Sequence, residues 1–226
     1  STDMKSFIRA LGREAESRAA ALATNRRGET ATLYFGGGTP SMLSDTHLGH
    51  LMETLDRLVP VDKLDEFSFE ANPATFTEKK VRFWRSLGMT RVSLGVQSLD
   101  SGILHLLGRE HTPAQALHSV EMLKNAGMPH INMDLMFAIP GQTLSIWEAT
   151  LKEAVRAGTD HISAYNLTYE EDTEFFRSLL RGEKRQDPDE DAAFFELAEH
   201  MLEAAGLRHY ETSNYAREGC ISPHNM

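Results

Sequence analysis

The sequence predicts an α/β fold in which about six parallel strands alternate with helices. Short apolar runs rich in β-branched and aromatic residues recur along the chain, and segments with the apolar spacing of an amphipathic helix lie between them. Glycine follows most of the helical segments, where a left-handed residue commonly ends a helix. Such an alternation implies parallel strands that are joined by right-handed crossovers.

The chain begins with a predicted helix over 3–26, whose apolar residues fall on one stripe. A strand follows at 32–35 and ends in three glycines. Ser44 and Asp45 form the expected N-cap of the next helix, because a side-chain oxygen there accepts a hydrogen bond from the first turn. The apolar positions of this helix are Leu48, Leu51, Leu55 and Leu58.

The same strand–helix unit then recurs, and a shorter strand closes the series. The strands and the helix after each are 66–70 with 77–87, 91–96 with 112–125, 131–137 with 144–157, and 161–165 with 189–205; the last strand is 208–212. No linker interrupts the series, so we expect residues 1–226 to form one core domain. We interpret the charged stretch 170–191 as a solvated excursion that leads into a helix.

A doubly wound sheet and a TIM-type barrel both satisfy this alternation. Five of the six predicted strands carry unusual polar residues at or just beyond their carboxyl ends. The functional residues of a (β/α) barrel gather at the mouth that these ends form. The sequence therefore favours a barrel with a site at its carboxyl-terminal mouth.

Composition argues against several classes of function. The net charge of −10 disfavours a nucleic-acid duplex or an anionic membrane as the main partner. No apolar run reaches the length of a membrane span, and residues 1–5 lack the layout of a signal peptide, so we expect a cytoplasmic protein. Cys220 is the only cysteine, so the chain alone cannot supply the several thiolates of a zinc or iron–sulfur site.

A triple glycine at 36–38, followed by Thr39 and Pro40, ends the first predicted strand. Glycine adopts backbone conformations that are closed to other residues, and it lets a ligand approach the peptide groups directly. The loop can therefore hold a small polar ligand with its N–H and C=O groups. A tight strand-to-helix turn is the alternative interpretation.

Charged and amide side chains stand at the other strand ends. Glu70 and Arg109 could bind the two charged groups of a zwitterion. Gln97 and Asp134 could bind vicinal hydroxyls, as acidic residues bind ribose in other folds. Taken singly, Glu70 and Arg109 are also consistent with solvated surface charges. Asp134 is harder to explain in that way, because it interrupts an apolar strand where an unpartnered charge is unfavourable.

Six motifs follow one another along the chain: YFGGGTP, FSFEANP, RVSLGVQSLD, LGREHT, INMDLMFAIPGQT and ISAYNLTYEEDT. In this order they resemble the radical S-adenosylmethionine (SAM) family, and within it the oxygen-independent coproporphyrinogen III oxidase-like proteins. The resemblance implies a partial (β/α) barrel of TIM type, without the family's first strand, that binds SAM across its mouth.

The resemblance also implies roles for individual residues at the amino-acid end of SAM. Gly37, Gly38 and Thr39 match the segment that lines the methionyl moiety. Glu70 matches the acidic residue near the amino group, and Arg109 matches the arginine near the carboxylate.

Other residues match positions near the nucleoside. Gln97 and Asp134 correspond to the ribose-binding pair. Met136 and Thr168 correspond to positions that contact adenine, through an apolar side chain and through the backbone respectively. His224 resembles the start of the family's His-Asn-x-x-Tyr-Trp element and is the candidate for a role toward a substrate or haem.

The family also has a Cys-x-x-x-Cys-x-x-Cys loop whose three thiolates hold a [4Fe–4S] cluster. An electron from the cluster splits SAM and gives a 5′-deoxyadenosyl radical. Neither this loop, nor the first strand, nor the family's C-terminal domain is found in these 226 residues. We therefore expect the chain to be part of a longer protein, to be inactive by itself and to contribute no metal ligand.

The resemblance leaves the reaction open. One branch of the group oxidatively decarboxylates coproporphyrinogen III, and another acts as a haem-binding chaperone. The motifs FEANP and GVQSLDSGILHLLGREHT are more similar to the second branch. The implied partners are SAM, a tetrapyrrole or haem, and an electron donor such as a flavodoxin or ferredoxin.

Two alternatives belong to other classes. A cluster-free barrel enzyme could bind a phosphorylated small molecule with its glycine loop, but Glu70 and Asp134 would place negative charge beside the phosphate. A haem-binding module without turnover is the other alternative.

Overall fold

The computed structural model describes residues 2–23, 30–167 and 188–226. The chain divides into two compact units. The first unit comprises Ser1–Ser93, Glu121–Pro129 and Ser222–Met226, and the second comprises Leu94–Val120 and His130–Ile221. A single core domain over residues 1–226 stays a prediction.

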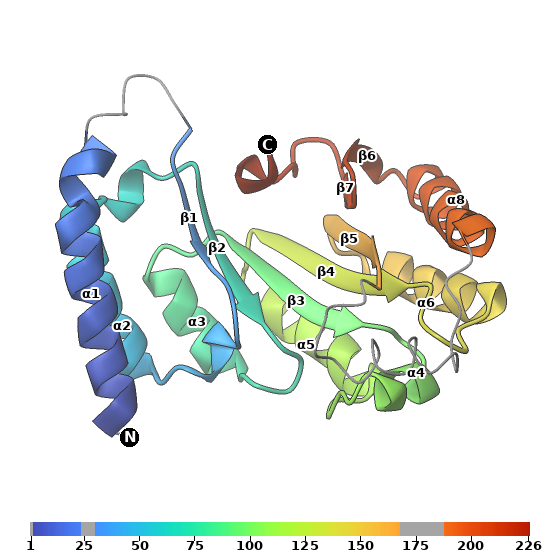
Figure 1. Ribbon diagram of the computed structural model, residues 1–226, viewed down its shortest axis with the longest axis horizontal. Coiled ribbons are helices and arrows are strands. Elements are labelled where there is room, and N and C mark those ends of the chain that lie inside the picture. The colour runs from blue at the N-terminus through green and yellow to red at the C-terminus, as the bar shows by residue number, and fades with distance from the viewer. Residues whose placement is uncertain (1, 24–29, 168–187) are drawn as a thin grey trace. The chain divides into compact units, whose positions relative to one another are not determined.

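The first unit is built from helices packed beside two parallel strands (Figure 1). Its elements are α1 (Thr2–Ala23), β1 (Thr32–Phe35), η1 (Pro40–Met42), α2 (Asp45–Leu58), η2 (Val61–Lys63), β2 (Glu66–Ala71), α3 (Glu78–Ser86) and η3 (Pro223–Asn225). Phe67 and Phe69 of β2 are buried, and the Phe69 ring lies 4.8 Å from that of Trp84 on α3. As expected, the Ser44 side chain caps α2 by accepting a hydrogen bond from the His47 N–H.

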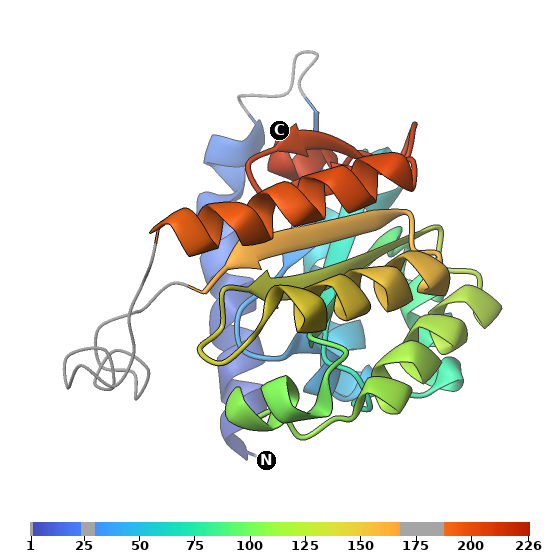
Figure 2. The ribbon, with the colours of Figure 1, turned by 90° about the vertical axis from the view of Figure 1, so that its right-hand side faces the viewer.

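Strand β3 (Arg91–Gln97) and helix α5 (Pro113–Asn125) each contain one of the unit boundaries. The other elements of the second unit are α4 (Ser101–Leu106), β4 (His130–Phe137), α6 (Leu144–Ala157), β5 (His161–Asn166), α8 (Pro188–Ala204), β6 (Arg208–Glu211) and β7 (Asn214–Ala216). Strands β4 and β5 are parallel, with Asn132 opposite His161. Figure 2 shows α6 and α8 side by side, and the indole N–H of Trp147 on α6 donates a 3.0 Å hydrogen bond to the Phe194 carbonyl on α8.

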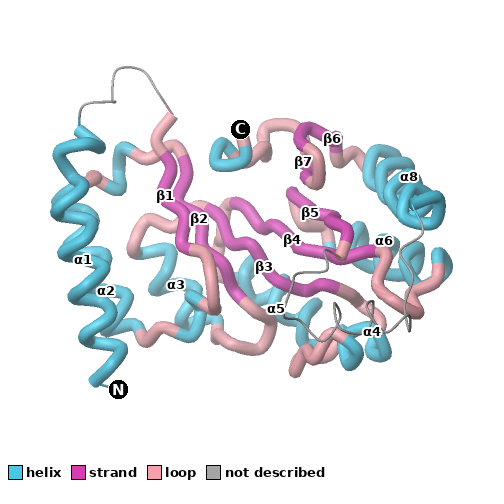
Figure 3. The backbone as a smooth tube through the Cα atoms, viewed as in Figure 1, coloured by secondary structure: helices cyan, strands magenta, loops and turns pink. Residues whose placement is uncertain are grey.

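The described strands have the order β1-β2-β3-β4-β5-β7-β6, and Figure 3 distinguishes them from the helices and loops. The expected α/β fold is present, but the last strand is not parallel. Strand β6 pairs antiparallel with β7, which pairs antiparallel with β5. Only Thr212 and Ser213 separate β6 from β7, and so short a connection can join only antiparallel strands. Helix α4 and strand β7 were not predicted.

Alternation along β4 separates a polar face from an apolar one. Ile131, Met133, Leu135 and Phe137 are all buried. The residues between them include Asn132, Asp134 and Met136, which share the opposite face. The same alternation places Glu66, Ser68 and Glu70 on one face of β2. None of the helices within the described ranges is long and apolar enough to cross a membrane.

Candidate functional site

Glu70 binds the glycine loop of the first unit. This half-buried side chain stands near the carboxyl end of β2. Its Oε2 accepts a 2.9 Å hydrogen bond from the Gly37 N–H, and its Oε1 accepts one of 2.6 Å from the Tyr34 hydroxyl. The structure therefore brings together two predicted site residues, Gly37 and Glu70, and adds Tyr34.

The three glycines of the loop are needed for different physical reasons. Gly37 and Gly38 have φ angles of +77° and +59°, and a Cβ added to either would meet nothing within 4 Å. At Gly36, an added Cβ would lie 2.4 Å from a ring carbon of Tyr34 and 2.9 Å from Oε1 of Glu70. Gly36 thus permits a close approach, whereas Gly37 and Gly38 form a left-handed turn that is open on its side-chain face.

Thr39 links the glycine loop to the segment after β2. Its Oγ1 accepts a 3.2 Å hydrogen bond from the Asn72 amide. The Asn72 backbone N–H donates to Oγ of Ser41 over 3.3 Å, and the hydroxyls of Ser41 and Thr75 lie 2.6 Å apart. These bonds hold the two loops of the first unit against each other.

His224 lies against β1. Its ring is stacked on that of Tyr34, with centroids 4.3 Å apart and planes at 6°. Its Nδ1 lies 3.2 Å from Oγ1 of Thr32. His224 therefore contacts the side chain that donates to Glu70.

In the second unit, Gln97 is the last residue of β3. It is 5% exposed and has a φ of +67°, which is unusual for a residue other than glycine. Its Oε1 accepts a 2.7 Å hydrogen bond from the hydroxyl of Tyr165, which stands opposite Met136 on the neighbouring strand. Tyr165 thus connects Gln97 with the polar face of β4 and β5.

Asp134 takes part in a hydrogen-bond network on that face. Its Oδ1 accepts a 2.7 Å bond from the Asn132 amide, which also donates to Oγ of Ser163 over 2.9 Å. Oδ1 of Asn132 lies 2.6 Å from Nδ1 of the buried His161, whose Nε2 lies 2.7 Å from the Tyr210 hydroxyl. The network fixes the position of the Asp134 carboxylate.

Met136 supplies an apolar wall in the second unit. It packs against the buried cluster of Ile103, Ile139 and Leu167. This environment fits the contact with a flat aromatic base that the resemblance implies. Thr168, the other predicted adenine contact, lies outside the described residues.

Arg109 follows α4, and its backbone N–H donates a 2.9 Å hydrogen bond to the Leu104 carbonyl. Nearby, Nε2 of the buried His111 donates over 3.1 Å to the carbonyl of Val96. Burial lowers the pKa of His111, and the charge of Arg109 adds to this effect, against the hydrogen bond to Val96, which raises it. His111 is therefore a neutral side chain that supports the end of β3.

Left-handed residues other than glycine occur near the carboxyl ends of three strands. Ala74 follows β2 with a φ of 61°, Gln97 ends β3 with 67°, and Ala138 follows β4 with 55°. Such conformations are unfavourable for residues with a Cβ and gather at functional sites. They support the prediction that the site lies at these strand ends.

Sequence reasoning missed the tyrosines and the network. Tyr34 and Tyr165 each donate to a predicted site residue, Glu70 and Gln97 respectively. The alternation of His161, Ser163 and Tyr165 along one face of β5 was the available signal.

The described residues fit SAM but not an iron–sulfur cluster. An anionic carboxylate beside an open glycine turn suits an ammonium group and the chain that carries it. A [4Fe–4S] cluster is held by several thiolates, and the sequence has one cysteine. These 226 residues therefore do not supply the ligands of such a cluster.

Comparisons with known proteins identify the family. The family model described as the radical SAM superfamily matches residues 11–154. The heme chaperone HemW of Bacillus subtilis is 36% identical over 197 residues, which cover 86% of this chain and 52% of that protein. The mitochondrial radical S-adenosyl methionine domain-containing protein 1 of Danio rerio is 35% identical over 196 residues, which cover 86% of this chain and 44% of that protein.

A solved structure shows the same fold. Coproporphyrinogen III oxidase (HemN) from Escherichia coli, described as a radical SAM enzyme, matches with a TM-score of 0.80 at 23% identity, over 96% of this chain and 49% of that chain. This likeness confirms the predicted partial barrel. The chain spans about half the length of the curated relatives that it matches.

Proposed function

Since this chain belongs to the radical SAM superfamily, we propose that it is the SAM-binding core of a haem-related protein of the oxygen-independent coproporphyrinogen III oxidase-like group. The observation that carries the proposal is the Glu70 carboxylate, held by the Gly37 N–H and the Tyr34 hydroxyl beside an open glycine turn. Superfamily membership implies SAM and a [4Fe–4S] cluster.

The first unit would bind the amino-acid end of SAM. Each Glu70 oxygen accepts one of the two hydrogen bonds described above and keeps a lone pair for the ammonium group. The exposed turn at Gly37 and Gly38 offers backbone groups to the methionyl chain. Thr39 holds the loop closed against Asn72.

The second unit would bind the nucleoside and the carboxylate. Asp134 is held by Asn132 and Gln97 by Tyr165, so both are oriented before ribose hydroxyls arrive. Met136 offers its apolar side chain to adenine, and Arg109 is the candidate for the SAM carboxylate. A cluster, when bound, supplies the electron for the reductive cleavage of SAM; its thiolates would come from residues other than these 226.

The relatives favour the haem-chaperone branch. HemW proteins match at 36% identity in Bacillus subtilis, whereas HemN matches at 23% and therefore supports the fold alone. Haem delivery is accordingly the proposed role, and His224 the candidate residue toward haem. Coproporphyrinogen III dehydrogenation is the alternative within the group. An electron donor such as a flavodoxin or ferredoxin, and a cytoplasmic location, belong to the same proposal.

The geometry disfavours a phosphate site in the glycine loop. A phosphate would need the Gly37 N–H, but this group already donates its hydrogen bond to the Glu70 carboxylate. Two anions at one donor repel each other, and the site would have to expel Glu70 first.

Binding of SAM to the longer, cluster-loaded protein tests the assignment. We expect Glu70→Gln and Arg109→Ala each to weaken SAM binding by about tenfold or more, as measured by anaerobic calorimetry, since each removes a charge partner (~1.4 kcal/mol per tenfold). Glu196→Gln, at an exposed position of α8, is the matched control and should bind SAM normally. Unchanged affinity in both site variants would contradict the assignment.

Two further measurements on the longer, cluster-loaded protein distinguish the haem-chaperone branch from the dehydrogenase branch. Haem titration should give a Soret band at about one haem per chain, and incubation with SAM, reductant and coproporphyrinogen III should give no protoporphyrinogen IX. Turnover of coproporphyrinogen III would instead support the dehydrogenase alternative.

A further inference from the structure

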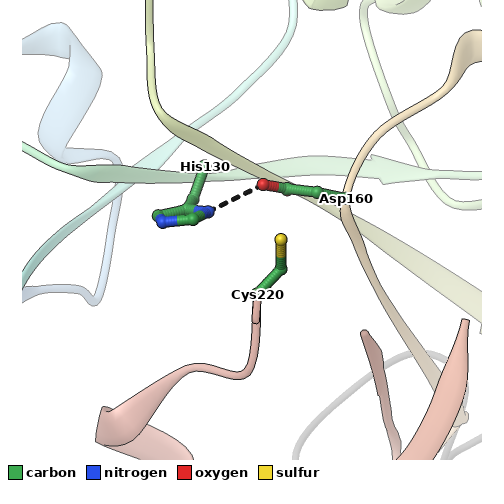
Figure 4. A group of neighbouring side chains, drawn as sticks. All are labelled: His130, Asp160 and Cys220. Carbon is green, nitrogen blue, oxygen red and sulfur yellow. Dashed lines mark hydrogen bonds and ion pairs between the residues drawn. The ribbon is translucent and has the colours of Figure 1, made fainter. Parts of the chain in front are cut away.

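Three side chains that can bind metals converge in the second unit, near the amino ends of β4 and β5. His130 begins β4, Asp160 immediately precedes β5, and Cys220 follows β7. One ligand atom from each lies within 4.8 Å of the others. Figure 4 shows the imidazole, the carboxylate and the thiol pointing toward one another from three separate segments.

Backbone hydrogen bonds hold this cluster in place. Oδ1 of Asp160 accepts a 2.8 Å bond from the Ile131 N–H, and Oδ2 lies 2.8 Å from Nδ1 of His130. The Arg217 N–H donates to the Asp160 carbonyl over 2.9 Å, and the Cys220 N–H donates to the Arg217 carbonyl over 3.0 Å. Hydrogen bonds to the backbone therefore hold all three ligand residues near the amino ends of β4 and β5.

The spacing is close to that of a tetrahedral metal site. Bonds of the usual length to zinc place neighbouring N, O and S ligand atoms about 3.3–3.6 Å apart. Nδ1 and Oδ2 are now 2.8 Å apart, and the thiol lies within 4.8 Å of both. Shifts of roughly 1 Å, which side-chain torsions allow, would reach the required geometry.

We propose that Nδ1 of His130, a carboxylate oxygen of Asp160 and Sγ of Cys220 bind one divalent transition-metal ion of the zinc class, with water as the fourth ligand. A mixed nitrogen, oxygen and sulfur set suits a borderline-soft ion and disfavours Mg²⁺ or Ca²⁺, which take oxygen ligands. Partial burial of all three residues limits competition from bulk water while leaving a path for entry. The site does not depend on SAM binding.

Binding changes the proton count in a defined way. The Cys220 thiol loses its proton to solvent, because the thiolate is the ligand. Metal binding requires the Nε2–H tautomer of His130, because Nδ1, which now faces Asp160, must carry no proton to bind the metal. The long contact of 3.8 Å from the thiol to the Glu218 carbonyl is lost. The bound ion replaces the His130–Asp160 hydrogen bond.

Cobalt titration of the 226-residue chain tests the site directly. Because Cys220 is its only cysteine, any thiolate-to-cobalt charge-transfer band must come from this residue. We expect one equivalent of Co²⁺ to give that band and Zn²⁺ to abolish it. Competition with a chromophoric chelator then gives the Zn²⁺ affinity.

Variants assign the ligands. Cys220→Ser should abolish the band, and both His130→Ala and Asp160→Asn should weaken Zn²⁺ binding at least about tenfold. His200→Ala removes an exposed histidine of α8 and should leave both signals unchanged. Circular dichroism of each variant checks folding. Cys220→Ser keeps the His130–Asp160 bond and so tests the proposal even if His130→Ala unfolds.

Two results would overturn the proposal. One is the absence of a thiolate band on the folded wild-type chain. The other is a Zn²⁺ affinity that is equal in the wild type, Cys220→Ser and His200→Ala. In either case the His130–Asp160 pair would be a structural link between two strand ends, and Cys220 a packing residue.

Discussion

Strand β2 carries two glutamates on one face, four residues apart, with opposite surroundings. Glu66 is 2% exposed and pairs with the buried Arg91, whose Nε lies 2.6 Å from Oε2 of Glu66. Its Oε1 accepts hydrogen bonds from Ser68 over 2.8 Å and from Ser222 over 2.6 Å. Glu66 therefore has partners on both oxygens, and all of them are side chains of the first unit.

Glu70 stands at the other end of the strand and is only half-buried. Its partners are the Gly37 N–H and the Tyr34 hydroxyl, and beside them the backbone turns through positions where added Cβ atoms would meet nothing. The difference shows how one residue type serves two purposes on one strand. A carboxylate enclosed by an arginine and hydroxyls supports the fold, whereas the one beside open backbone is the one that we propose to bind a cation.

Removing the buried glutamate should have the largest effect on stability. Glu66→Ala leaves the Arg91 guanidinium buried without its counter-charge. We expect the free energy of unfolding in urea to fall by about 3–5 kcal/mol. Glu70→Gln is the matched variant on the same face and should lose less than about 1 kcal/mol. Equal losses in the two variants would contradict the division between a structural and a binding glutamate.

Acidification should reproduce part of the loss of stability that we expect for Glu66→Ala. Burial raises the pKa of Glu66, but the hydrogen bonds from Ser222 and Ser68 and the charge of Arg91 outweigh it, so the pKa lies below its ordinary value of 4.5. A lowered pKa stabilises the fold above the ordinary value, and this contribution is lost as the pH falls through the lowered one.

Urea unfolding measured from pH 7 downward should show this loss only below the ordinary range of a glutamate. The effect should be smaller than in Glu66→Ala, because protonation keeps the side chain. Glu66→Gln should flatten the acid limb of the curve. An acid limb that is unchanged in Glu66→Gln would show that other carboxylates cause the loss.

A methyl group in the open turn should have a smaller effect that comes from backbone conformation alone. Gly37→Ala forces a Cβ into a φ of +77° without a clash. We expect a loss of about 1–2 kcal/mol in the free energy of unfolding. Gly49→Ala in helix α2, where an added Cβ lies 3.9 Å from Phe83, should instead gain about 0.5–1 kcal/mol. Losses of the same sign at both glycines would argue against this explanation.

The smallest stability effect should come from the hydroxyl of Tyr34. Tyr34→Phe keeps the ring that stacks on His224 and removes the donor to Glu70. The free energy of unfolding should change by no more than about 1 kcal/mol, since the Tyr34 hydroxyl and the Glu70 carboxylate are both accessible to water. SAM affinity of the longer protein should fall a few-fold, because Glu70 loses one of the bonds that orient it. A loss as large as that of Glu70→Gln would mean that Tyr34 contacts SAM itself.

Much of the fold could be predicted because its signals are local. Strands β1 to β5 and the helices after them, α4 excepted, follow from apolar spacing, from caps such as Ser44 and from terminal glycines such as Gly158, whose φ is 66°. Strand β6 was predicted as an element, but its antiparallel direction and strand β7 could not be predicted in the same way. Their direction depends on pairing with β5, and a three-residue strand has almost no periodicity of its own.

The site was predictable to the extent that its residues stand at strand ends. Gly37 and Glu70 meet as expected, but their link through Tyr34 depends on side-chain direction across two strands. The left-handed backbone of Gln97 carries no sequence signature, since glutamine rarely adopts it. The cluster of His130, Asp160 and Cys220 joins residues far apart in the sequence, which only the folded chain brings together.

The polar face of β4 also restricts how the sheet can pair. A shift of one residue would exchange the two faces of the strand, so that Asn132 and Asp134 would point toward Trp147 and the helix layer. At the same time Ile131 and Met133 would enter the hydrogen-bonded face and leave His161 without its amide partner. Asn132 and Asp134 thus make a one-residue shift of β4 against β5 unfavourable, so the polar face that is proposed to meet a nucleoside also fixes the register of the sheet.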